Sequence, residues 1–558
     1  MRISHRLALH ALWIATALRV LVPSAADPDL WGHLLFGDVF LHAGIASTNG
    51  FAYTTPAHPW IDHELGAEAV MAAVYAALGS RGLVLLKVML VLATLALVRR
   101  AALRRCHATW AATIATAFSA VIMTPGFMIR PQLFTLLGVA LVLELVGSAH
   151  YRPRGVAWML PLVVAVWINL HGGALAGIGL AAIGLAAGAW HRPARRRELE
   201  PPAGLDTRSP VIAGPAPRTR QRADLARAAI LILLLAAATL VNVYGARLPW
   251  FLVTKVTPRV PISEWAPVPL ADLSFAAFKA ALVAIVGWLV LARRGRLAET
   301  LVVVAAAAAA LLHQRHIPLF AIAAAPLLAA ALRDVGALLR LRRRQRSCAR
   351  LLRGGIAGLT AVQVVLAIVV IARSQGRIDV DPGIYPVQAL RFLTQNDIVG
   401  RVALPFDWGE VALWSLPAGS SVAVDGRFTT AYPQYLLDES WRFMRGGDGW
   451  SDLLTRYPTD VVVSARSQPP SQLLGDDPEW TYVYSDPVAV VFLRRVPSQA
   501  AAIARFHDGR FTYDATPLDP AFPALARGAY DGRRASAGGG ATPGAPDSAT
   551  LATAWSGP

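Results

Sequence analysis

The sequence predicts an α-helical polytopic membrane protein of about eleven spans, followed by a small α/β domain. Of its 558 residues, 55% are hydrophobic and only 16% are charged, and the mean hydropathy is +0.46. Soluble chains carry roughly a quarter charged residues. The net charge of +18 comes from short arginine clusters between apolar runs. That pattern is typical of membrane loops, so no nucleic-acid partner is expected.

A helix needs about 20 apolar residues to cross a bilayer, with a lower limit near 17. Arg2 and Arg6 precede the first apolar segment, and arginine clusters recur in every second loop, beginning with Arg99–Arg105. The positive-inside rule therefore predicts an inner or plasma membrane protein with a cytoplasmic N-terminus and a periplasmic or extracellular C-terminal domain. The predicted spans lie near 7–23, 82–98, 108–124, 132–148, 156–170, 173–190, 228–246, 274–292, 298–313, 317–332 and 354–372.

The first outer loop, 24–81, contains two apolar stretches that are too short to cross. They are Leu30–Leu41 and Glu64–Leu78, and the second would place Arg99–Arg105 outside if it were counted as a span. We therefore expect two interfacial helices in this loop. The predicted transmembrane domain, with this loop included, covers residues 1–373.

Short β-rich runs alternate with helical stretches over 374–497, beyond the last span. The runs include RVALP, DVVVSA and AVVFLRR. Strands separated by helices predict an extracytoplasmic α/β domain with a largely parallel sheet. The Ala, Gly, Pro and Ser content rises after Ser498, which predicts a disordered tail over 498–558.

Every predicted outer loop carries ionisable or amide side chains. Such groups are costly at span ends unless they face a cavity or a partner, so a shared polar cavity on the outer side is expected. The expected lining groups other than the catalytic and phosphate-binding candidates are His33, His63, Glu64, Asn169 and Glu264.

Lipid phosphates lie at the depth of this predicted cavity. Arginine and histidine bind phosphate through charge-assisted hydrogen bonds, and the candidates are Arg130, Arg315, His316 and His171. A nearby carboxylate can take the proton of an attacking hydroxyl, and the candidates are Asp27 and Asp29. Since Asp29 can serve as a helix cap, Asp27 is favoured as the base or as a metal ligand. Transfer of a sugar from a lipid-linked phosphate needs such a base and such a cation.

The run Asp27-Pro28-Asp29-Leu30-Trp31, the two helices in the same loop, the many spans and the outer domain resemble a GT-C-fold glycosyltransferase. The stretch DPDLWGHLLFGDVFLHAG…WIDHE also resembles bacterial membrane proteins of that superfamily. The likeness extends to about residue 496. It implies a polyprenyl-phosphate sugar as donor and one loop carboxylate as base or metal ligand, and it leaves the acceptor open. No cofactor is certain, and a divalent metal on Asp27, Asp29 and His63 is an open alternative that no specific spacing supports.

The outer domain offers two further candidate sites. Phe406-Asp407-Trp408-Gly409 resembles the aromatic–Asp–aromatic–Gly acceptor-reading motif of oligosaccharyltransferases, but it lacks the leading tryptophan pair, so acceptor-peptide recognition is not inferred. Asp425 and Arg427 follow an apolar strand, where α/β domains place binding residues and where a plain turn serves equally well. Asp407, Trp408, Asp425 and Arg427 are therefore the candidates in this domain.

Two other classes of function fit the same pattern. A transporter or flippase of lipid-linked glycans would place polar groups near mid-membrane, whereas the predicted span interiors here are mostly Ala, Leu and Val. A non-catalytic GT-C-like protein of envelope assembly would share the fold without the chemistry, and the fold alone does not separate the two.

Overall fold

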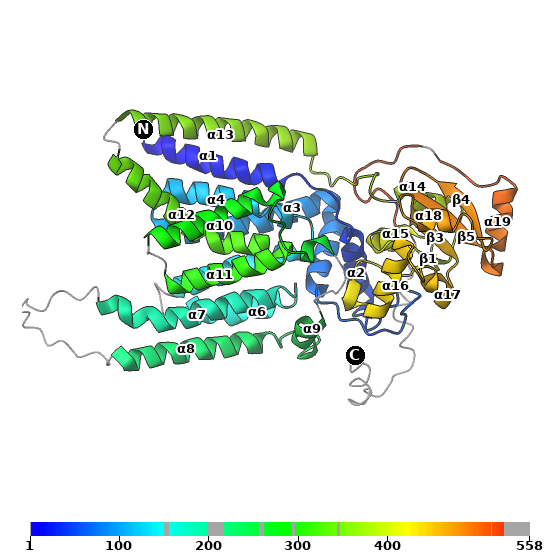
Figure 1. The fold of residues 1–558 in the computed structure, drawn as a ribbon, viewed down its shortest axis with the longest axis horizontal. Helices are drawn as coiled ribbons and strands as arrows, with labels where there is room; N and C mark the ends of the chain where they lie inside the picture. The colour runs from blue at the N-terminus through cyan, green and yellow to red at the C-terminus, as the bar shows by residue number, and fades with distance from the viewer. Residues whose placement is uncertain are drawn as a thin grey trace, which may run out of the picture. The chain divides into compact units, whose positions relative to one another are not determined.

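A computed structural model describes residues 2–149, 156–197, 217–255, 262–292, 296–342, 346–514 and 516–528. The chain divides into two compact units. The first consists of Met1–Leu30 and Asp62–Val380, and the second of Trp31–Ile61 and Asp381–Pro558. The first unit is a helical bundle, and the second is built around a small sheet (Figure 1). The first outer loop was predicted to belong wholly to the transmembrane domain, but most of it groups with the second unit.

Each of the eleven predicted spans overlaps a helix of the first unit, and α9 is a twelfth described helix that no predicted span covers. The helices are α1 (Arg2–Leu21), α3 (Leu65–Cys106), α4 (Thr109–Ile122), α5 (Gln132–Ala149), α6 (Leu160–Trp167), α7 (Ala174–Arg197), α8 (Pro217–Ala238), α9 (Arg247–Lys255), α10 (Ala276–Ala292), α11 (Leu297–Leu312), α12 (Ile317–Arg342) and α13 (Arg346–Ser374). The short 3-10 helices are η1 (Thr124–Gly126), η2 (Val156–Met159), η3 (Ser263–Trp265), η4 (Leu273–Phe275) and η5 (Gln314–His316). Four segments are long and apolar enough to cross a membrane: 65–106, 273–291, 314–338 and 354–374. The number of spans stays a prediction.

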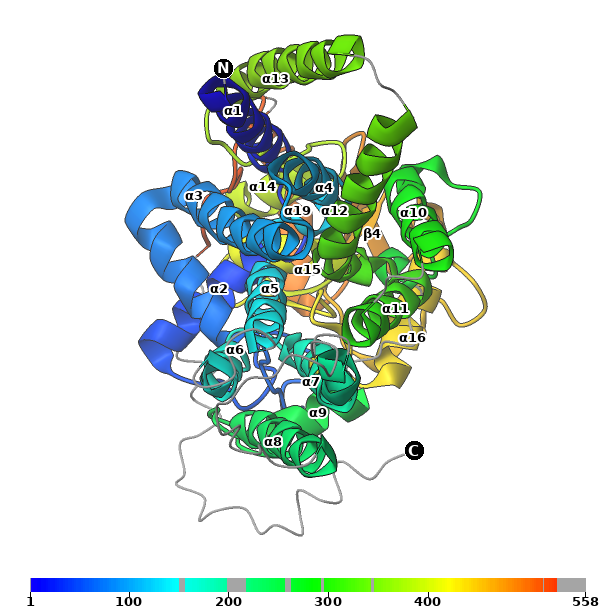
Figure 2. The same cartoon turned by 90° about the vertical axis from the view of Figure 1, so that its left-hand side faces the viewer.

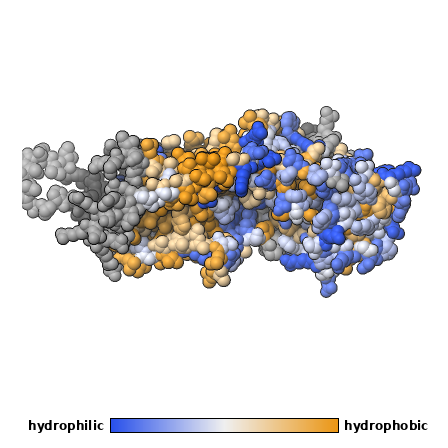
Figure 3. All heavy atoms as spheres, turned by 90° about the horizontal axis from the view of Figure 1, so that it is seen from above, coloured by the Kyte–Doolittle hydropathy of each residue, from blue (hydrophilic) through white to orange (hydrophobic). Residues whose placement is uncertain are grey.

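Helix α12 has neighbours on several sides in the bundle, packing on α3, α4, α10 and α11 (Figure 2). Ala321, Ala324 and Ala325 of α12 are fully buried, as are Thr113 and Thr116 of α4. Such small side chains let helix backbones approach closely in a membrane, where packing rather than water exclusion drives association. The bundle surface carries exposed apolar side chains, which suits contact with lipid (Figure 3).

Helix α3 is bent near its start. Gly79 has φ +62° and ψ −155°, outside the helical region, and it separates Leu65–Leu78 from the rest of the helix. Glycine adopts positive φ without the steric cost that a Cβ brings. The separate helix expected over Glu64–Leu78 is therefore present, and its interfacial position stays a prediction.

Helix α8 ends at Ala238, earlier than the predicted span end at 246. The side chain of Asn242 accepts a hydrogen bond from the backbone N–H of Tyr244 and donates to the carbonyl of Gly245. Asparagine side chains that bond the backbone two residues onward favour turns over helix. The apolar run therefore breaks at Asn242 before α9 begins.

The second unit contains a five-stranded mixed sheet in the order β2-β1-β3-β5-β4. Its strands are β1 (Arg401–Ala403), β2 (Ser421–Val422), β3 (Val461–Ala465), β4 (Trp480–Ser485) and β5 (Ala489–Arg494). Its helices are α2 (Leu30–Ala43), α14 (Val387–Gln395), α15 (Gly409–Ser415), α16 (Gln434–Arg445), α17 (Asp452–Arg456), α18 (Pro470–Leu473) and α19 (Ala500–His507), with η6 (Phe406–Trp408), η7 (Phe428–Thr430) and η8 (Pro497–Gln499). The α/β class is confirmed.

The expectation of a largely parallel sheet is correct for only part of the sheet. Strand β1 is parallel to β2 and β3, whereas β5 is antiparallel to β3 and β4. The connection from β4 to β5 is too short for a parallel crossover, which needs a dozen or more residues. Asp486 closes this turn by accepting hydrogen bonds from the backbone N–H groups of Val488 and Ala489.

The prediction that residues 498–558 form a disordered tail is wrong for the part that extends to residue 528. Helix α19 lies within it, and the following segment packs on its own unit. The backbone N–H of Thr512 donates to Asn396 Oδ1 at 2.8 Å, and Phe522 is buried with its ring centroid 5.0 Å from that of Trp31. A few aromatic residues in a polar stretch are enough to order it by burial. Residues 529–558 lie outside the described residues.

Candidate functional site

A short bridge fixes the segment that carries Asp27 and Asp29 in the first unit. The N–H of Ala26 donates to the carbonyl of Asp379 at 2.7 Å, and the N–H of Asp379 donates to the carbonyl of Ser24 at 2.8 Å. Asp27 then accepts the backbone N–H of Asp29 on its Oδ1 at 3.1 Å. The turn-forming carboxylate is thus Asp27, where the sequence had favoured Asp29 for that role.

Arg130 lies in the turn before α5 and contacts three carboxylates. Its Nε is 2.5 Å from Asp27 Oδ1, its Nη2 is 3.2 Å from Asp29 Oδ2, and its Nη1 is 3.4 Å from Glu264 Oε2. Burial by itself would lower the pKa of the Arg130 guanidinium, but the three carboxylates together raise it. Arg130 is therefore a fixed cation inside an acidic cluster, with its charge already outnumbered.

Asp29 is the accessible member of the aspartate pair. Its side chain is 25% exposed, whereas that of Asp27 is fully buried. Burial raises the pKa of the Asp29 carboxyl well above its usual range, and the charges of Asp27, Glu264 and Glu64 raise it further against the opposing effect of Arg130. Such a carboxyl can hold and release a proton closer to neutral pH than an ordinary aspartate can.

Glu264 links this cluster to a second arginine. Arg315 Nη1 is 3.8 Å from Glu264 Oε1, and its guanidinium carbon lies 4.4 Å from the ring centroid of Trp265. Arg315 therefore has one distant carboxylate partner and an aromatic face beneath it. Its neighbour His316 is partly buried and lines the same cavity.

Four groups form a hydrogen-bonded chain from α6 to the start of α3. Trp167 Nε1 donates to Thr135 Oγ1 at 3.2 Å, and Thr135 Oγ1 lies 2.8 Å from His171 Nδ1. The backbone N–H of Gly173 also donates to His171 Nδ1, at 2.9 Å. A ring nitrogen that accepts a hydrogen bond carries no proton, so neutral His171 holds its proton on Nε2. That atom lies 3.1 Å from Glu64 Oε1.

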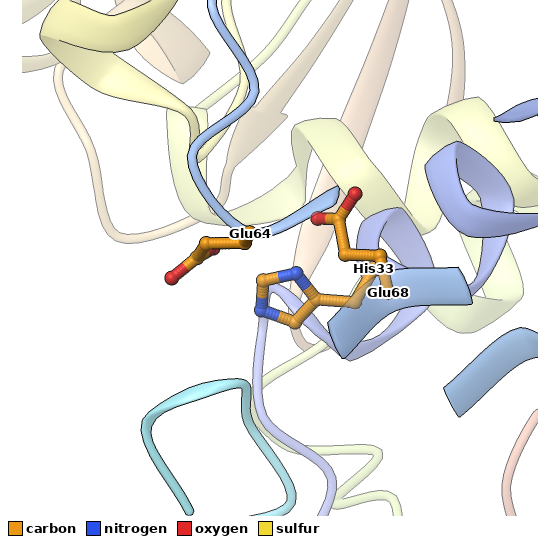
Figure 4. Close-up of side chains that lie close together, drawn as sticks. All are labelled: His33, Glu64 and Glu68. Atoms are coloured by element: carbon orange, nitrogen blue, oxygen red, sulfur yellow. The ribbon is translucent and has the colours of Figure 1, made fainter. Parts of the chain in front are cut away.

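Glu64 lies just before α3, and Glu68 follows one helical turn later (Figure 4). His63 contributes a second imidazole, with its Nε2 3.8 Å from Glu64 Oε1 and its ring centroid 6.1 Å from that of His171. The segment is fixed from outside α3, because the N–H of Gly66 donates to the carbonyl of Asn169 at 3.0 Å. Asn169 itself donates to the carbonyls of Ala165 and Val241, so its role here is to shape the turn.

A cavity of about 570 Å³ lies at one end of the bundle. Of the residues expected to share a cavity, His63, His171, Glu264, Arg315 and His316 line it, whereas Asp27, Asp29, Arg130, Glu64 and Asn169 are not among its lining residues. The cavity lies where α5, α7 and α12 begin. The polar groups that line it are His63, Gln132, Thr135, His171, Ser263, Glu264, Ser274, Gln314, Arg315 and His316. Apolar atoms make up most of the remaining wall. The sequence did not single out Thr135, because threonine is a common residue type and only its neighbours Trp167 and His171 give it a place in the cavity.

Asp27, Asp29 and His63 do not fit the metal site that the sequence left open. In the part of the chain that the structure describes, these three do not form a group at ligand spacing. Arg130 lies against both aspartates, and His63 is beside Glu64 instead. The positive guanidinium already occupies the place that a cation would take between the two carboxylates.

The candidate residues of the second unit lie in surroundings that indicate a role in the fold. His33 is a buried residue of α2. Trp408 is buried and donates to the carbonyl of Ile384 at 3.0 Å, while Asp407 is exposed on η6. A Cβ on Gly409 would lie 2.6 Å from Asp425 Cα, so this glycine is required for close packing at the end of β2. Phe406, Trp408 and Gly409 of this run therefore belong to the domain core, whereas Asp407 lies at its surface.

Arg427 and Asp425 form an enclosed ion pair. Arg427 Nε and Nη2 lie 2.9 and 2.6 Å from the two Asp425 oxygens, and Asn49 Oδ1 accepts a further bond at 2.6 Å. The guanidinium carbon lies 4.6, 5.0 and 4.5 Å from three ring centroids, those of Phe36, Phe51 and Trp60. This arrangement attaches the segment 31–61 to the domain and leaves no open face for a ligand on the guanidinium.

No protein-family model matches the chain, and no curated protein matches its sequence. Solved structures do match. The structure of ArnT from Cupriavidus metallidurans bound to undecaprenyl phosphate aligns with 88% of this chain and 98% of its own, at 14% identity and a TM-score of 0.50. The same protein in its apo state aligns with 87% of this chain and 96% of its own, at 15% identity and a TM-score of 0.47.

At 14% identity the first match shows the fold alone. This chain shares the overall fold of that ArnT structure, over 88% of its length. The expected fold class is thereby confirmed, and the roles of individual residues are the subject of the proposal that follows.

Proposed function

We propose that this chain is a membrane glycosyltransferase that moves a sugar from a polyprenyl phosphate to an acceptor on the outer face of the membrane. The observation that carries the proposal is the continuous cluster from Asp29 through Arg130 and Glu264 to Arg315, which reaches a cavity of about 570 Å³. A GT-C structure bound to undecaprenyl phosphate supports the choice of donor. The cluster supplies both a proton acceptor and a cation for a departing phosphate.

Arg315 is the cation best placed to bind the donor phosphate. It lines the cavity, is 24% exposed, and has Glu264 as a carboxylate partner at 3.8 Å. Arg130, by contrast, contacts three carboxylates, which would repel a phosphate. As the sugar–phosphate bond breaks, negative charge grows on the phosphate oxygens, and a positioned guanidinium stabilises it.

Asp29 is the proposed general base. Its exposed fraction admits a substrate hydroxyl, and its raised pKa suits proton uptake near neutral pH. The acceptor oxygen, freed of its proton, would attack the anomeric carbon from the side opposite the phosphate and invert its configuration. Asp27 positions the segment through its backbone bond and through Arg130, without touching substrate.

The test uses the full chain in proteoliposomes with synthetic polyprenyl-phosphate sugars and measures release of the free lipid phosphate. The wild type and an Asp334→Asn control should turn over at least one donor. Asp334 contacts Arg333 and Trp288 at the other end of the bundle. The Asp27→Asn/Asp29→Asn double variant should not turn over.

Two results would contradict the proposal. Full turnover by the double variant would remove the assigned site. Movement of intact lipid-linked sugar across the bilayer without any release of lipid phosphate would assign the chain to the transporter class instead.

A further inference from the structure

The first unit contains a second cavity, of about 360 Å³, that shares no lining residue with the first. It lies at the ends of α1 and α4 and beside α3. Two of its lining residues are cations, Arg19 and Lys87, and no acidic residue lines it. Its other lining residues are Val20, Pro23, Ser24, Ala25, Val121, Thr124, Phe127, Met128 and Ile129.

Lys87 is buried, with only 1% of its surface exposed. Its Nζ donates to the carbonyl of Pro23 at 2.9 Å and to Ser24 Oγ at 2.6 Å. An ammonium has three donors, so these two neutral acceptors leave one for a ligand. Among the described residues no carboxylate pairs with Lys87. A buried charge without a counter-ion is costly, and inside a membrane domain it indicates a functional site.

Arg19 supplies the second charge. Its Nε donates to Gln363 Oε1 of α13 at 2.9 Å, which fixes the side chain without neutralising it. Both cations line one cavity, and among the described residues neither has an acidic partner, so an anion bound there would supply the missing countercharge.

The walls identify the class of anion. Val20, Phe127, Met128 and Ile129 are apolar, and Val121, at the rim, is 38% exposed on the bundle surface. A site with cations at its head and apolar side chains below suits a lipid whose charge is a phosphate. A free metabolite of the same charge would gain nothing from these walls.

We infer that the Arg19–Lys87 cavity binds the phosphate of an anionic glycerophospholipid. The site is separate from the proposed donor cavity, and its occupancy does not depend on glycosyl transfer. Two lining residues are close in sequence to the acidic cluster: Ala25 lies two positions before Asp27, and Ile129 lies one position before Arg130. A bound lipid would therefore also hold the two segments that carry the cluster.

The test measures lipid retention by native mass spectrometry on the purified full chain with phosphatidylglycerol, with phosphatidylcholine, and with inorganic phosphate alone. The wild type should retain phosphatidylglycerol with about a tenfold preference over phosphatidylcholine. The two phosphates accept the same hydrogen bonds, but the choline ammonium adds a positive charge beside Arg19 and Lys87, and each cation favours an anionic lipid by about 1 kcal/mol. Lys87→Met and Arg19→Gln should each lower the preference about fivefold or more. Lys279→Met is the matched control, since Lys279 also donates to two neutral acceptors, the carbonyls of Leu270 and Asp272, but is only partly buried and lies outside this cavity.

Val121→Trp keeps both charges and fills the rim, so it should also lower retention if Lys87→Met fails to fold. Unchanged retention in Arg19→Gln and Val121→Trp would overturn the inference. If the protein retained inorganic phosphate as strongly as it retained phosphatidylglycerol, the assignment of the site to a lipid would be overturned. Loss of phosphatidylglycerol together with normal sugar transfer would support this site and leave the proposed function intact.

Discussion

Two buried arginine–aspartate clusters in this protein are built from the same groups and lead to different conclusions. Arg427 faces one aspartate, Asp425, and three aromatic rings enclose it. Arg130 faces three carboxylates and connects through Glu264 to a large cavity. The first cluster is balanced and closed, as a structural ion pair should be. The second carries excess negative charge beside an open space, which stability alone does not require.

The largest expected effect is a loss of sugar transfer when the Arg130 cluster, and not the Arg427 cluster, is changed. Asp29→Asn removes the proposed base and should lower the rate of sugar transfer about 10²–10⁴-fold, the usual contribution of general base catalysis. The melting temperature should not fall. A carboxyl whose pKa is raised in the folded state binds more protons folded than unfolded, so its contribution to stability decreases as pH rises past the ordinary aspartate range. A neutral amide removes that cost at pH 7. A wild-type rate with a lowered melting temperature would reverse the assignment.

The second effect is on stability. Arg427→Met leaves Asp425 buried without its charge partner and should cost about 3–5 kcal/mol in the free energy of unfolding. Arg401→Met is the control, because Arg401 also pairs with an aspartate, Asp460, but is 41% exposed. That variant should cost about 0–1 kcal/mol. Denaturant unfolding followed by intrinsic fluorescence measures both. Equal effects in the two variants would show that enclosure by the aromatic rings contributes nothing.

The third effect concerns the donor. Arg315→Gln should weaken binding of a polyprenyl phosphate about tenfold or more, since a hydrogen bond to a charged group contributes about 1.5–3 kcal/mol. Arg296→Gln is the control, because Arg296 likewise pairs with a glutamate, Glu299, at the opposite end of α11. Titration of the lipid phosphate into detergent-solubilised protein gives the two dissociation constants. Identical constants would leave the cavity without its proposed cation.

The smallest effect is a shift in pH dependence. The charge of Glu264 helps to raise the pKa of Asp29, so Glu264→Gln should lower that pKa and move the rising limb of the pH–rate profile to lower pH. The measurement is the pH at which the rate reaches half its maximum, compared between the variant and the wild type. Glu299→Gln provides the control, because Glu299 also lies between two arginines, Arg105 and Arg296. A shift to higher pH would exclude Asp29 as the titrating base.

Several predictions from sequence depended only on local pattern, and those were the reliable ones. The apolar runs located the helices of the bundle, and the β-rich runs located all five strands of the second unit. Predictions that needed knowledge of contacts were weaker. The tail to residue 528 folds because Phe511, Phe522 and Leu525 find partners far away in sequence. Strands β4 and β5 are antiparallel, contrary to the expected parallel sheet, because the connection between them at Asp486 is short.

The candidate site shows the same division. Its acidic, histidine and arginine residues could be named from sequence because ionisable groups are rare at span ends. The sequence could not show which of these residues are hydrogen-bonded to each other, which form ion pairs, or which line the same cavity. Asp425 and Arg427 were candidates because they follow an apolar strand, and Asp27 and Arg130 because they lie in outer loops. Only the surrounding rings and carboxylates show which pair is enclosed and which lies beside a cavity.

Composition and periodicity by themselves determined that this is a membrane protein with an α/β domain, because apolar length and alternation are properties of neighbouring residues in the chain. The tertiary structure decided that Arg130 is held by three carboxylates, that Arg315 lines a cavity, and that Lys87 is buried without an acidic partner among the described residues. Charge balance, burial and open volume depend on residues a hundred or more positions apart, and no local pattern in the sequence records them.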